Sequence, residues 1–258
     1  MTLDLFARPT LLFLPASNPR AIAKARDSGA DIAVLDLEDA VKAEDKATAR
    51  AAAVAAVADH WAMPVAIRIN GVGTAEHDDD LAAALGSGCD LIVVPMVDRP
   101  LFITGKPVAA MIETAAGVLA APAIARTVSA LIVGTNDLAA SLRLPLIDRA
   151  SMGFALQSAV VAARASGIAV FDGVFNWLED PQGLARECAE SRALGFDGKS
   201  LIHPDQIAPC QKAFAPGDEE IARAERLVAA ASGGAERFEG AMIEDLHVEA
   251  ARRLLARR

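Results

Sequence analysis

The sequence contains no tyrosine, and aromatic residues make up only 4% of it. A tyrosine hydroxyl is therefore excluded as a catalytic acid, and a core must be filled mainly by Ala, Val, Leu and Ile. Hydrophobic residues nevertheless account for 53% of the 258 residues, and charged residues for 23%. This composition is typical of a globular protein with a sizeable core and excludes a disordered chain or a fibrous repeat.

Basic runs and long apolar runs are also missing. The chain has 25 Lys and Arg against 34 Asp and Glu, a net charge of −9, so we expect no nucleic-acid partner. No apolar run reaches the length of about 18 residues that spans a membrane, and no signal segment is visible, so we expect a cytoplasmic protein without a membrane partner. Three cysteines, Cys89, Cys188 and Cys210, have neither disulfide nor metal-site spacing and are expected to be reduced, buried thiols.

Short apolar runs of strand-forming residues recur eight times, and a stretch with helical patterning is expected after each. The runs are Leu11–Pro15, Ile32–Leu37, Val65–Ile69, Leu91–Pro95, Val108–Ile112, Leu131–Val133, Ile168–Phe171 and Gly198–Ile202. The clearest helical stretches are Pro19–Ser28, Lys42–Val57, Ala115–Arg126 and Leu184–Leu194, and helix ends are expected at Gly29, Gly167 and Gly195. Buried parallel strands alternating with helices predict an α/β fold, and eight units in about 200 residues favour a closed (β/α)₈ TIM barrel.

The pattern changes after the eighth strand, so we divide the chain into a barrel domain, residues 1–214, and a C-terminal segment, residues 215–258. The segment is expected to contain a helix over Glu219–Ala231, a break at residues 232–234, and a short extended piece leading into a final helix within Phe238–Arg258. A (β/α)₈ barrel is complete without this C-terminal segment. The sequence leaves open whether it clamps its own barrel or reaches a neighbouring subunit.

Acidic residues follow several of the expected strands, at the end where (β/α)₈ barrels carry their chemistry. Glu113 and Asp137 follow neighbouring strands, so their carboxylates are placed to share a cation such as Mg²⁺, with Mn²⁺ as an alternative. Helix capping would explain either acid alone. Beside a further cluster of Asp36, Glu38 and Asp39, however, repulsion between carboxylates favours a bound cation.

Arg68 ends an otherwise apolar strand, so we expect its guanidinium to point toward the barrel mouth. There its fork suits a carboxylate or a developing enolate oxygen, although a structural ion pair with Asp36 or Glu38 is compatible with that role. Asp36 is expected to orient metal-bound water. Glu38 and Asp39 are expected to hold Arg68 or to cap the next helix.

Two further polar residues near the eighth strand are given structural roles. His203 precedes a proline and is expected to hydrogen-bond its own loop. Lys199 lies within an apolar strand, where an ion pair with Asp172 explains it and a Schiff-base role is the alternative. We interpret Gly71–Thr74 as a mobile loop after the third strand.

Seven motifs occur in order along almost the whole chain: Leu11–Pro15, Leu35–Val41, Arg68–Asn70, Ile112–Thr114, Gly134–Leu138, Gly195–Lys199 and Ile202–Pro204. Together they resemble the citrate lyase β-subunit-like proteins of the malyl-CoA lyase and HpcH/HpaI aldolase superfamily. The resemblance implies a barrel of the phosphoenolpyruvate/pyruvate type, a homotrimer or homohexamer, and Mg²⁺ held by the residues at positions Glu113 and Asp137. The substrate-binding positions that it implies are Arg68, Glu113, Gly134, Thr135 and Asn136.

In relatives, a C-terminal segment with a Gly-x-Met-Ile-Asp pattern closes over a neighbour's site, and its aspartate moves a proton. Glu244 occupies that position here, one methylene longer, and Asp245 follows it. A second departure is Met96, where the family commonly has a lysine after the fourth strand, so that a positive group is lost near the mouth.

These observations predict a Mg²⁺-dependent carbon–carbon lyase with Arg68, Glu113 and Glu244 as catalytic residues. It would reversibly cleave citryl-, citramalyl- or malyl-CoA into acetyl-CoA and a 2-oxo acid such as oxaloacetate, pyruvate or glyoxylate. A malyl- or citramalyl-CoA thioesterase on the same scaffold is one alternative, and a non-catalytic binder of 2-oxo acids or CoA esters is another. Membership of a citrate lyase complex, which acts on an acyl-carrier protein, is also left open.

Overall fold

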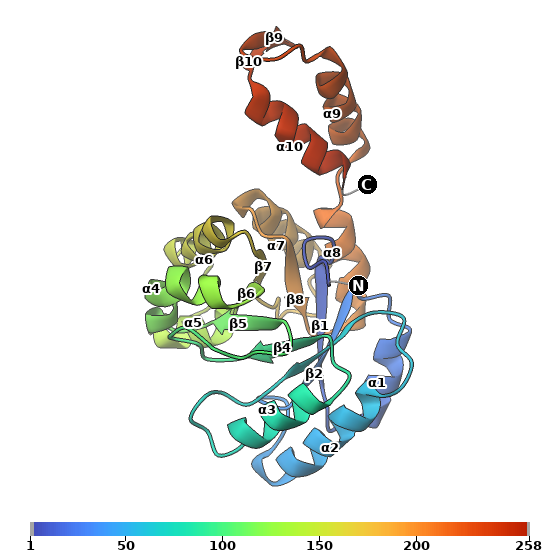
Figure 1. Cartoon of the computed structure of the whole chain (residues 1–258), viewed down its shortest axis with the longest axis vertical. Helices are drawn as coiled ribbons and strands as arrows, with labels where there is room; N and C mark the ends of the chain where they lie inside the picture. Colours follow the sequence, from blue (N-terminus) through green and yellow to red (C-terminus); the bar gives the residue numbers. More distant parts are fainter. Residues whose placement is uncertain (1–2, 257–258) are drawn as a thin grey trace. The chain divides into compact units, whose positions relative to one another are not determined.

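The computed structural model describes residues 3–256, and eight parallel strands within them close into a barrel (Figure 1). The strands pair in chain order, and β8 pairs back with β1. They are β1 (Thr10–Pro15), β2 (Ile32–Asp36), β3 (Val65–Arg68), β4 (Leu91–Val94), β5 (Val108–Ile112), β6 (Ala130–Val133), β7 (Ala169–Asp172) and β8 (Gly198–Leu201). The predicted (β/α)₈ barrel is therefore confirmed, and each strand lies where its apolar run predicted it.

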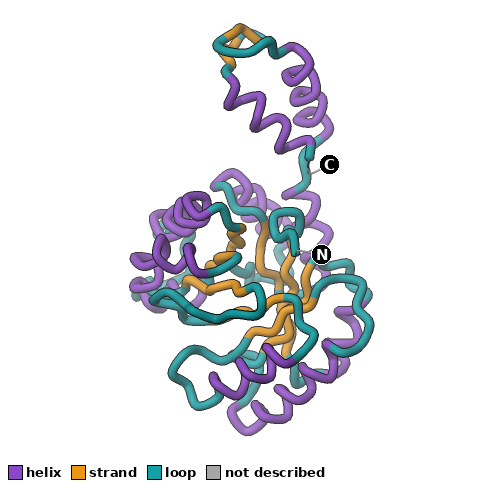
Figure 2. Tube along the Cα trace, in the orientation of Figure 1, coloured by secondary structure: helices purple, strands orange, loops and turns teal. Residues whose placement is uncertain are grey.

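Helices surround this barrel (Figure 2). They are α1 (Pro19–Arg26), α2 (Lys46–Val57), α3 (His77–Gly86), α4 (Ala115–Ile124), α5 (Thr135–Ser141), α6 (Gly153–Ser166), α7 (Pro181–Leu194) and α8 (Ile207–Phe214). Three 3₁₀ turns accompany them: η1 (Ala43–Asp45), η2 (Ala125–Thr127) and η3 (Pro204–Gln206). Gly167 and Gly195 end α6 and α7 in the left-handed conformation, as predicted. The prediction for Gly29 is wrong, because α1 ends at Arg26, where the Ser28 hydroxyl bonds the Ala25 carbonyl.

The connection between β4 and β5 also differs from the prediction, since residues 95–107 contain no helix. Three prolines, Pro95, Pro100 and Pro107, fall in this stretch. Each lacks a backbone N–H and disfavours helical geometry in the residue before it, so the segment crosses as a loop. The loop is held in part by Lys106, whose ammonium donates to the Cys89 carbonyl.

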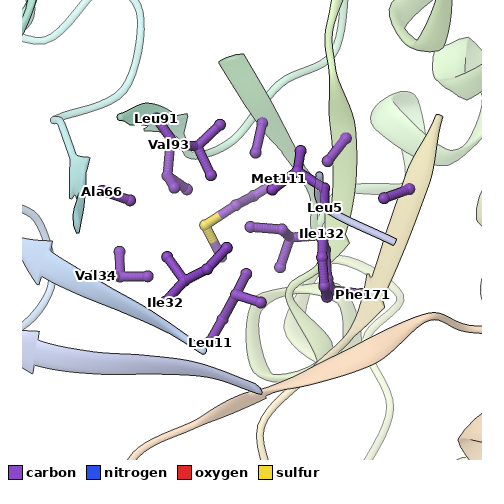
Figure 3. Packing of buried hydrophobic residues seen from close by; sticks show 13 residues of the cluster. Leu5, Leu11, Ile32, Val34, Ala66, Leu91, Val93, Met111, Ile132 and Phe171 are labelled. Carbon is purple, nitrogen blue, oxygen red and sulfur yellow. The ribbon is translucent and has the colours of Figure 1, made fainter. Parts of the chain in front are cut away.

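The inside of the barrel is packed with apolar side chains that point toward its axis (Figure 3). This interior cluster consists of Leu5, Leu11, Ile32, Val34, Ala66, Leu91, Val93, Ala109, Met111, Ala130, Ile132, Ala169 and Phe171. Side chains of a strand alternate between its two faces, so the cluster takes alternate residues, such as Ile32 and Val34 of β2 or Ala109 and Met111 of β5, whereas β8 contributes none. The barrel interior is thus a packed core rather than a channel, as is usual for this fold.

The chain separates into two compact units, of which the first ends at Gln211 and the second begins at Lys212. The second contains α9 (Asp218–Ala230), β9 (Glu236–Phe238), β10 (Ala241–Ile243) and α10 (Asp245–Leu255), and has a small core of its own. The expected extended piece is one strand of an antiparallel hairpin that the sequence did not predict. Residues 257 and 258 of the expected final helix lie outside the described residues.

None of the helices in residues 3–256 combines the length and the apolar composition that crossing a membrane requires. The three cysteines are free and buried, in agreement with their predicted role as structural thiols.

Candidate functional site

Eight of the ten predicted site residues line a single cavity of about 380 Å³ in the barrel unit. They are Asp36, Asp39, Arg68, Glu113, Gly134, Thr135, Asn136 and Asp137. All of them lie at or just after the carboxyl ends of β2, β3, β5 and β6. The parallel strands of the closed barrel bring these ends to one rim, which explains why residues so distant in sequence meet.

Arg68 is the centre of an ion-pair cluster beside this cavity. Its Nε and Nη2 atoms donate to the two carboxylate oxygens of Asp36, each over 2.6 Å. Its Nη1 atom lies 2.7 Å from Glu38 and 3.5 Å from Asp39. Burial acts to lower the pKa of Arg68, but the hydrogen bonds and charge of Asp36 outweigh it and hold that pKa above its usual value. The guanidinium is therefore a fixed positive charge in the cavity wall.

The expected ion pair of Arg68 is thus present, and Glu38 and Asp39 contact Arg68 rather than cap a helix. Asp36 also accepts hydrogen bonds from the backbone N–H groups of Glu38 and Ala40, so its carboxylate shapes the loop after β2. Burial, with Arg68 opposing it, raises the pKa of Glu38 to about 8. Glu38 itself lines a neighbouring cavity rather than this one, and it is linked to this one through its contact with Arg68.

Lys46 and Asn70 hold the same loop from outside the cavity, and sequence reasoning did not single out either residue. The Lys46 ammonium donates to the carbonyls of Leu37 and Glu38 and to the Asn70 side chain. Asn70 in turn donates to the Leu37 carbonyl. A lysine in the first turn of a helix gave no signal in the sequence, because its three acceptors come from residues distant in the chain or from backbone atoms.

Glu113 projects from the end of β5 and is 1% exposed. One of its carboxylate oxygens accepts a hydrogen bond from the Met96 N–H, and the other, Oε2, is buried with no hydrogen-bond partner among the described residues. Burial raises the pKa of Glu113 to about 7, with the Met96 N–H and Arg68 acting against it. Met96 adopts a positive φ of 54° to present this N–H, so its backbone, and not its side chain, serves the site.

Gly134 and Thr135 complete the wall next to Glu113. A Cβ atom at Gly134 would lie 2.1 Å from Glu113 Oε2, so only glycine leaves room for the carboxylate. The Thr135 hydroxyl is buried and has no partner among residues 3–256. Asn136 exchanges hydrogen bonds with Asn176, a cavity residue from the loop after β7 that the sequence did not predict.

The donor set at Glu113 and Asp137 fits Mg²⁺. Asp137 lies in the first turn of α5, and burial together with the Asp39 charge raises its pKa. No cluster of three or more His, Cys, Asp or Glu side chains suited to a metal occurs in the described part of the chain. Mg²⁺ in proteins is commonly held by only one or two carboxylates, with water and substrate oxygens filling the other positions. The unpaired oxygen of Glu113 is the observation that supports such a role.

Glu244, the remaining predicted site residue, lies in the second unit, at the start of α10. Its side chain is exposed, and its backbone N–H donates to His247. Its predicted role in proton transfer stays a prediction.

The two structural roles predicted near β8 agree with the contacts. Lys199 is fully buried, and its ammonium donates to Asp172 over 2.9 Å and to Glu187 over 2.6 Å. His203 accepts a hydrogen bond from the Asp205 N–H at the start of η3. Neither residue lines the cavity.

Fold and site together define a (β/α)₈ barrel with a group of acids and a buried arginine at its mouth. The family described as HpcH/HpaI aldolase/citrate lyase matches residues 9–105 and 102–204, and the chain belongs to this family. It is similar to a (3S)-malyl-CoA thioesterase of Cereibacter sphaeroides, with 37% identity over 96% of this chain and 93% of that protein. It is also similar to the citrate lyase subunit beta of Leuconostoc mesenteroides, with 35% identity over 86% of this chain and 82% of that protein.

Among solved structures, the chain resembles the protein CitE from Mycobacterium tuberculosis in complex with magnesium, acetoacetate and coenzyme A. The TM-score is 0.88 and the identity 33%, over 98% of this chain and 99% of that chain. The sequence-based identification as a citrate lyase β-subunit-like protein is therefore confirmed.

Proposed function

We propose that this protein is a Mg²⁺-dependent carbon–carbon lyase. It would cleave a 3-hydroxyacyl-CoA thioester of the citryl, citramalyl or malyl type into acetyl-CoA and a 2-oxo acid. The observation that carries the proposal is the buried, unpaired carboxylate oxygen of Glu113, in one cavity with Asp137 and Arg68. The CitE structure with magnesium and coenzyme A supports the choice of both ligands.

Bound Mg²⁺ would supply a Lewis acid for the oxygens of the 2-oxo acid portion. Glu113 and Asp137 would hold the ion, and Arg68 would place a fixed positive charge where negative charge develops on the substrate as the bond breaks. Because Asp36 already binds Arg68 through two hydrogen bonds, the guanidinium needs no reorganisation during the reaction. Glu244 would move a proton to or from the acetyl carbon.

A thioesterase is the second candidate, favoured by the 37% identity to a (3S)-malyl-CoA thioesterase. Malyl-, citramalyl- and citryl-CoA should be supplied in turn with Mg²⁺, while acetyl-CoA, free CoA and the 2-oxo acid are followed together. Equal amounts of acetyl-CoA and 2-oxo acid indicate the lyase. Free CoA and the intact hydroxy acid without acetyl-CoA indicate the hydrolase, and binding without any product supports a non-catalytic binder.

The metal assignment is tested with Glu113→Gln and Asp137→Asn. Each change removes one charged ligand, so we expect Mg²⁺ affinity and Mg²⁺-dependent turnover to fall by at least about 100-fold, the effect of roughly 3 kcal/mol. Calorimetric titration with Mg²⁺ and steady-state rates measure the two quantities. Asp98→Asn, an exposed acid outside the cavity, is the control. Undiminished activity in both variants would contradict the assignment.

The assembly and location belong to the same proposal: a cytoplasmic homotrimer or homohexamer in which the C-terminal segment, residues 215–258, serves as a lid and residues 1–214 as the catalytic domain. Light scattering coupled to size-exclusion chromatography measures the number of subunits.

A further inference from the structure

Ser200 is a buried hydroxyl in the cavity for which neither the sequence nor the proposed mechanism has a use. The residue is 3% exposed, it lines the cavity, and its Oγ atom has no hydrogen-bond partner in the described part of the chain. Leaving a buried hydroxyl unpaired costs stability, whereas alanine would fill the same place without that cost. A serine here therefore indicates that something else completes its hydrogen bond.

The register of β8 shows where the side chain points. Ser200 pairs with Leu11 of β1, which belongs to the interior cluster. The preceding residue, Lys199, reaches outward to Glu187 of α7, and successive residues of a strand face opposite ways. Ser200 therefore projects into the barrel, at the inner wall of the cavity, where Phe13 and Met111 supply mainly apolar neighbours.

The closed strand order places Ser200 on a different part of the rim from the proposed metal ligands. Glu113 follows β5 and Asp137 follows β6, whereas β8 lies two strands beyond β6, next to β1. A ligand anchored on the two acids therefore extends across the mouth toward the wall that β8 and β1 form. On the inner side of that wall, the ligand would contact the polar side chain of Ser200.

This inference rests on the proposed function, because the substrate class determines which chemical group of the substrate reaches Ser200. The reacting carbon carries a hydroxyl and a carboxylate, which face the metal ligands, and an acyl thioester arm. That arm must leave through the mouth, because coenzyme A is too large for a cavity of about 380 Å³. The fourth substituent of the reacting carbon therefore faces the inner wall of the cavity and Ser200.

We propose that Ser200 is a specificity residue that hydrogen-bonds this fourth substituent. The protein then selects 2-oxo acids with an oxygen-bearing group on the third carbon, a carboxylate or a hydroxyl, over those that end in a methyl group. A site built to hydrogen-bond a ligand group rejects the analogue without it, because its own polar atom stays unpaired. Bound pyruvate would leave the Ser200 hydroxyl without a hydrogen-bond partner.

The test is calorimetric binding of oxaloacetate, 3-hydroxypyruvate and pyruvate to the full-length protein with saturating Mg²⁺. We expect the wild type to bind at least one of the two polar acids about 3- to 10-fold more tightly than pyruvate, the worth of one net hydrogen bond. Tighter oxaloacetate identifies a carboxylate as the selected group, and tighter hydroxypyruvate a hydroxyl. Ser200→Ala should bring the ratio to pyruvate near one, and Ser200→Thr, which keeps a hydroxyl, should preserve it.

A second measurement separates this role from a structural one. Since Ser200→Ala removes an unpaired hydroxyl, the unfolding temperature of the ligand-free protein should stay the same or rise while selectivity is lost. Ser158→Ala, which removes a half-buried hydroxyl on α6 outside the cavity, is the matched control and should change neither quantity. A wild-type preference for pyruvate, or an unchanged ratio in Ser200→Ala, overturns the inference. Failure of the folded wild type to bind any of the three acids with Mg²⁺ overturns the proposed function itself.

Discussion

Gly134 shows how strongly a single residue constrains the metal ligands. A methyl group there would overlap Glu113 Oε2, which lies 2.1 Å from the position of a Cβ atom. The residue was predicted to bind substrate, and the structure adds a packing reason for glycine at this position. The carboxylate has no room to retreat, because Glu113 is 1% exposed.

We therefore expect Gly134→Ala to displace the Glu113 carboxylate and to weaken Mg²⁺ binding by about tenfold or more, with a loss of about 1–3 kcal/mol in the free energy of unfolding. Titration with Mg²⁺ and urea unfolding measure the two effects. Gly86→Ala is the control, since a Cβ atom there meets nothing within 4 Å. Unchanged Mg²⁺ affinity in Gly134→Ala would show that Glu113 has freedom that its burial does not indicate.

Asp172 is a buried acid on which we expect acid stability to depend. Burial acts to raise its pKa, but the charges of Lys199 and Arg149 hold that pKa below its usual value. Protons therefore bind the unfolded chain more readily at this residue. The stabilisation is complete at pH values above the unfolded pKa, about 3.9, and is lost as the pH falls through the lower pKa of the folded state.

Asp172→Asn should lower the free energy of unfolding at pH 7 by about 3–5 kcal/mol, because Lys199 and Arg149 lose a buried partner. Below pH 4, the variant should lose less stability per pH unit than the wild type. Urea unfolding between pH 3 and pH 7 measures both. Glu190→Gln, which removes an exposed partner of Arg149, should have an effect of about 1 kcal/mol or less. If the variant and the wild type lost the same free energy of unfolding per pH unit below pH 4, Asp172 would not be the residue on which acid stability depends.

At the scale of a single element, α6 carries a glycine at each end, and the two are needed for different reasons. Gly153 begins the helix, whereas Gly167 follows it at a φ of 68°, in the left-handed region. A Cβ atom at either position would meet nothing within 4 Å, so packing does not separate the two. The backbone conformation at each position therefore determines how alanine changes the free energy of unfolding.

Gly153→Ala should therefore raise the free energy of unfolding by about 0.5–1 kcal/mol, since alanine is the better helix former. Gly167→Ala should lower it by about 1 kcal/mol, since a side chain disfavours positive φ. Each variant serves as the control for the other in urea unfolding. Effects of the same sign at both ends would show that the helix boundaries of α6 differ from those described.

The elements themselves were largely predictable because their signals are local. Apolar runs marked the eight strands, and glycines such as Gly195 marked helix ends. The prediction failed between β4 and β5, where Pro100 and Pro107 exclude a helix, and at the hairpin of β9 and β10, whose strands have only three residues each. Strands so short leave too few residues for an alternating pattern.

The site was predictable only in part, for a related physical reason. Strand ends meet at one rim in any barrel, so Arg68, Glu113 and Asp137 were brought together by topology alone. The contacts of Lys46 with the loop after β2 and the unpaired hydroxyl of Ser200 depend on side-chain directions in the folded chain. No spacing in the sequence encodes either one.

At the scale of the whole molecule, part of the net charge of −9 is concentrated in the cavity wall. Among residues 3–256, four acids, Asp36, Asp39, Glu113 and Asp137, line it against the single cation Arg68. A bound divalent cation would offset this excess. Burial is the main cause of the raised pKa values of Glu113 and Asp137, and the neighbouring acids add to it. The acidic composition is thus compatible with binding an anionic substrate.

Glu244 carries the last prediction, since it belongs to the second compact unit while the other predicted residues belong to the first. If it moves the proton, Glu244→Gln should lower turnover by about 100-fold or more, within the range for a general acid or base, and leave Mg²⁺ and 2-oxo acid affinity unchanged. Glu249→Gln, another exposed acid of α10, is the control. Full activity in Glu244→Gln would exclude the role.

The same variant decides whether Glu244 serves its own barrel or that of a neighbour. Glu113→Gln and Glu244→Gln subunits should each be inactive alone, and they can be unfolded, mixed and refolded together. If the segment acts on a neighbouring subunit, some sites in the mixed oligomer combine an intact Glu113 with an intact Glu244 from another chain, and activity returns. If it acts on its own barrel, every site lacks one of the two residues, so the mixture stays inactive. The recovered rate, compared with that of wild-type protein refolded in the same way, therefore distinguishes the two arrangements.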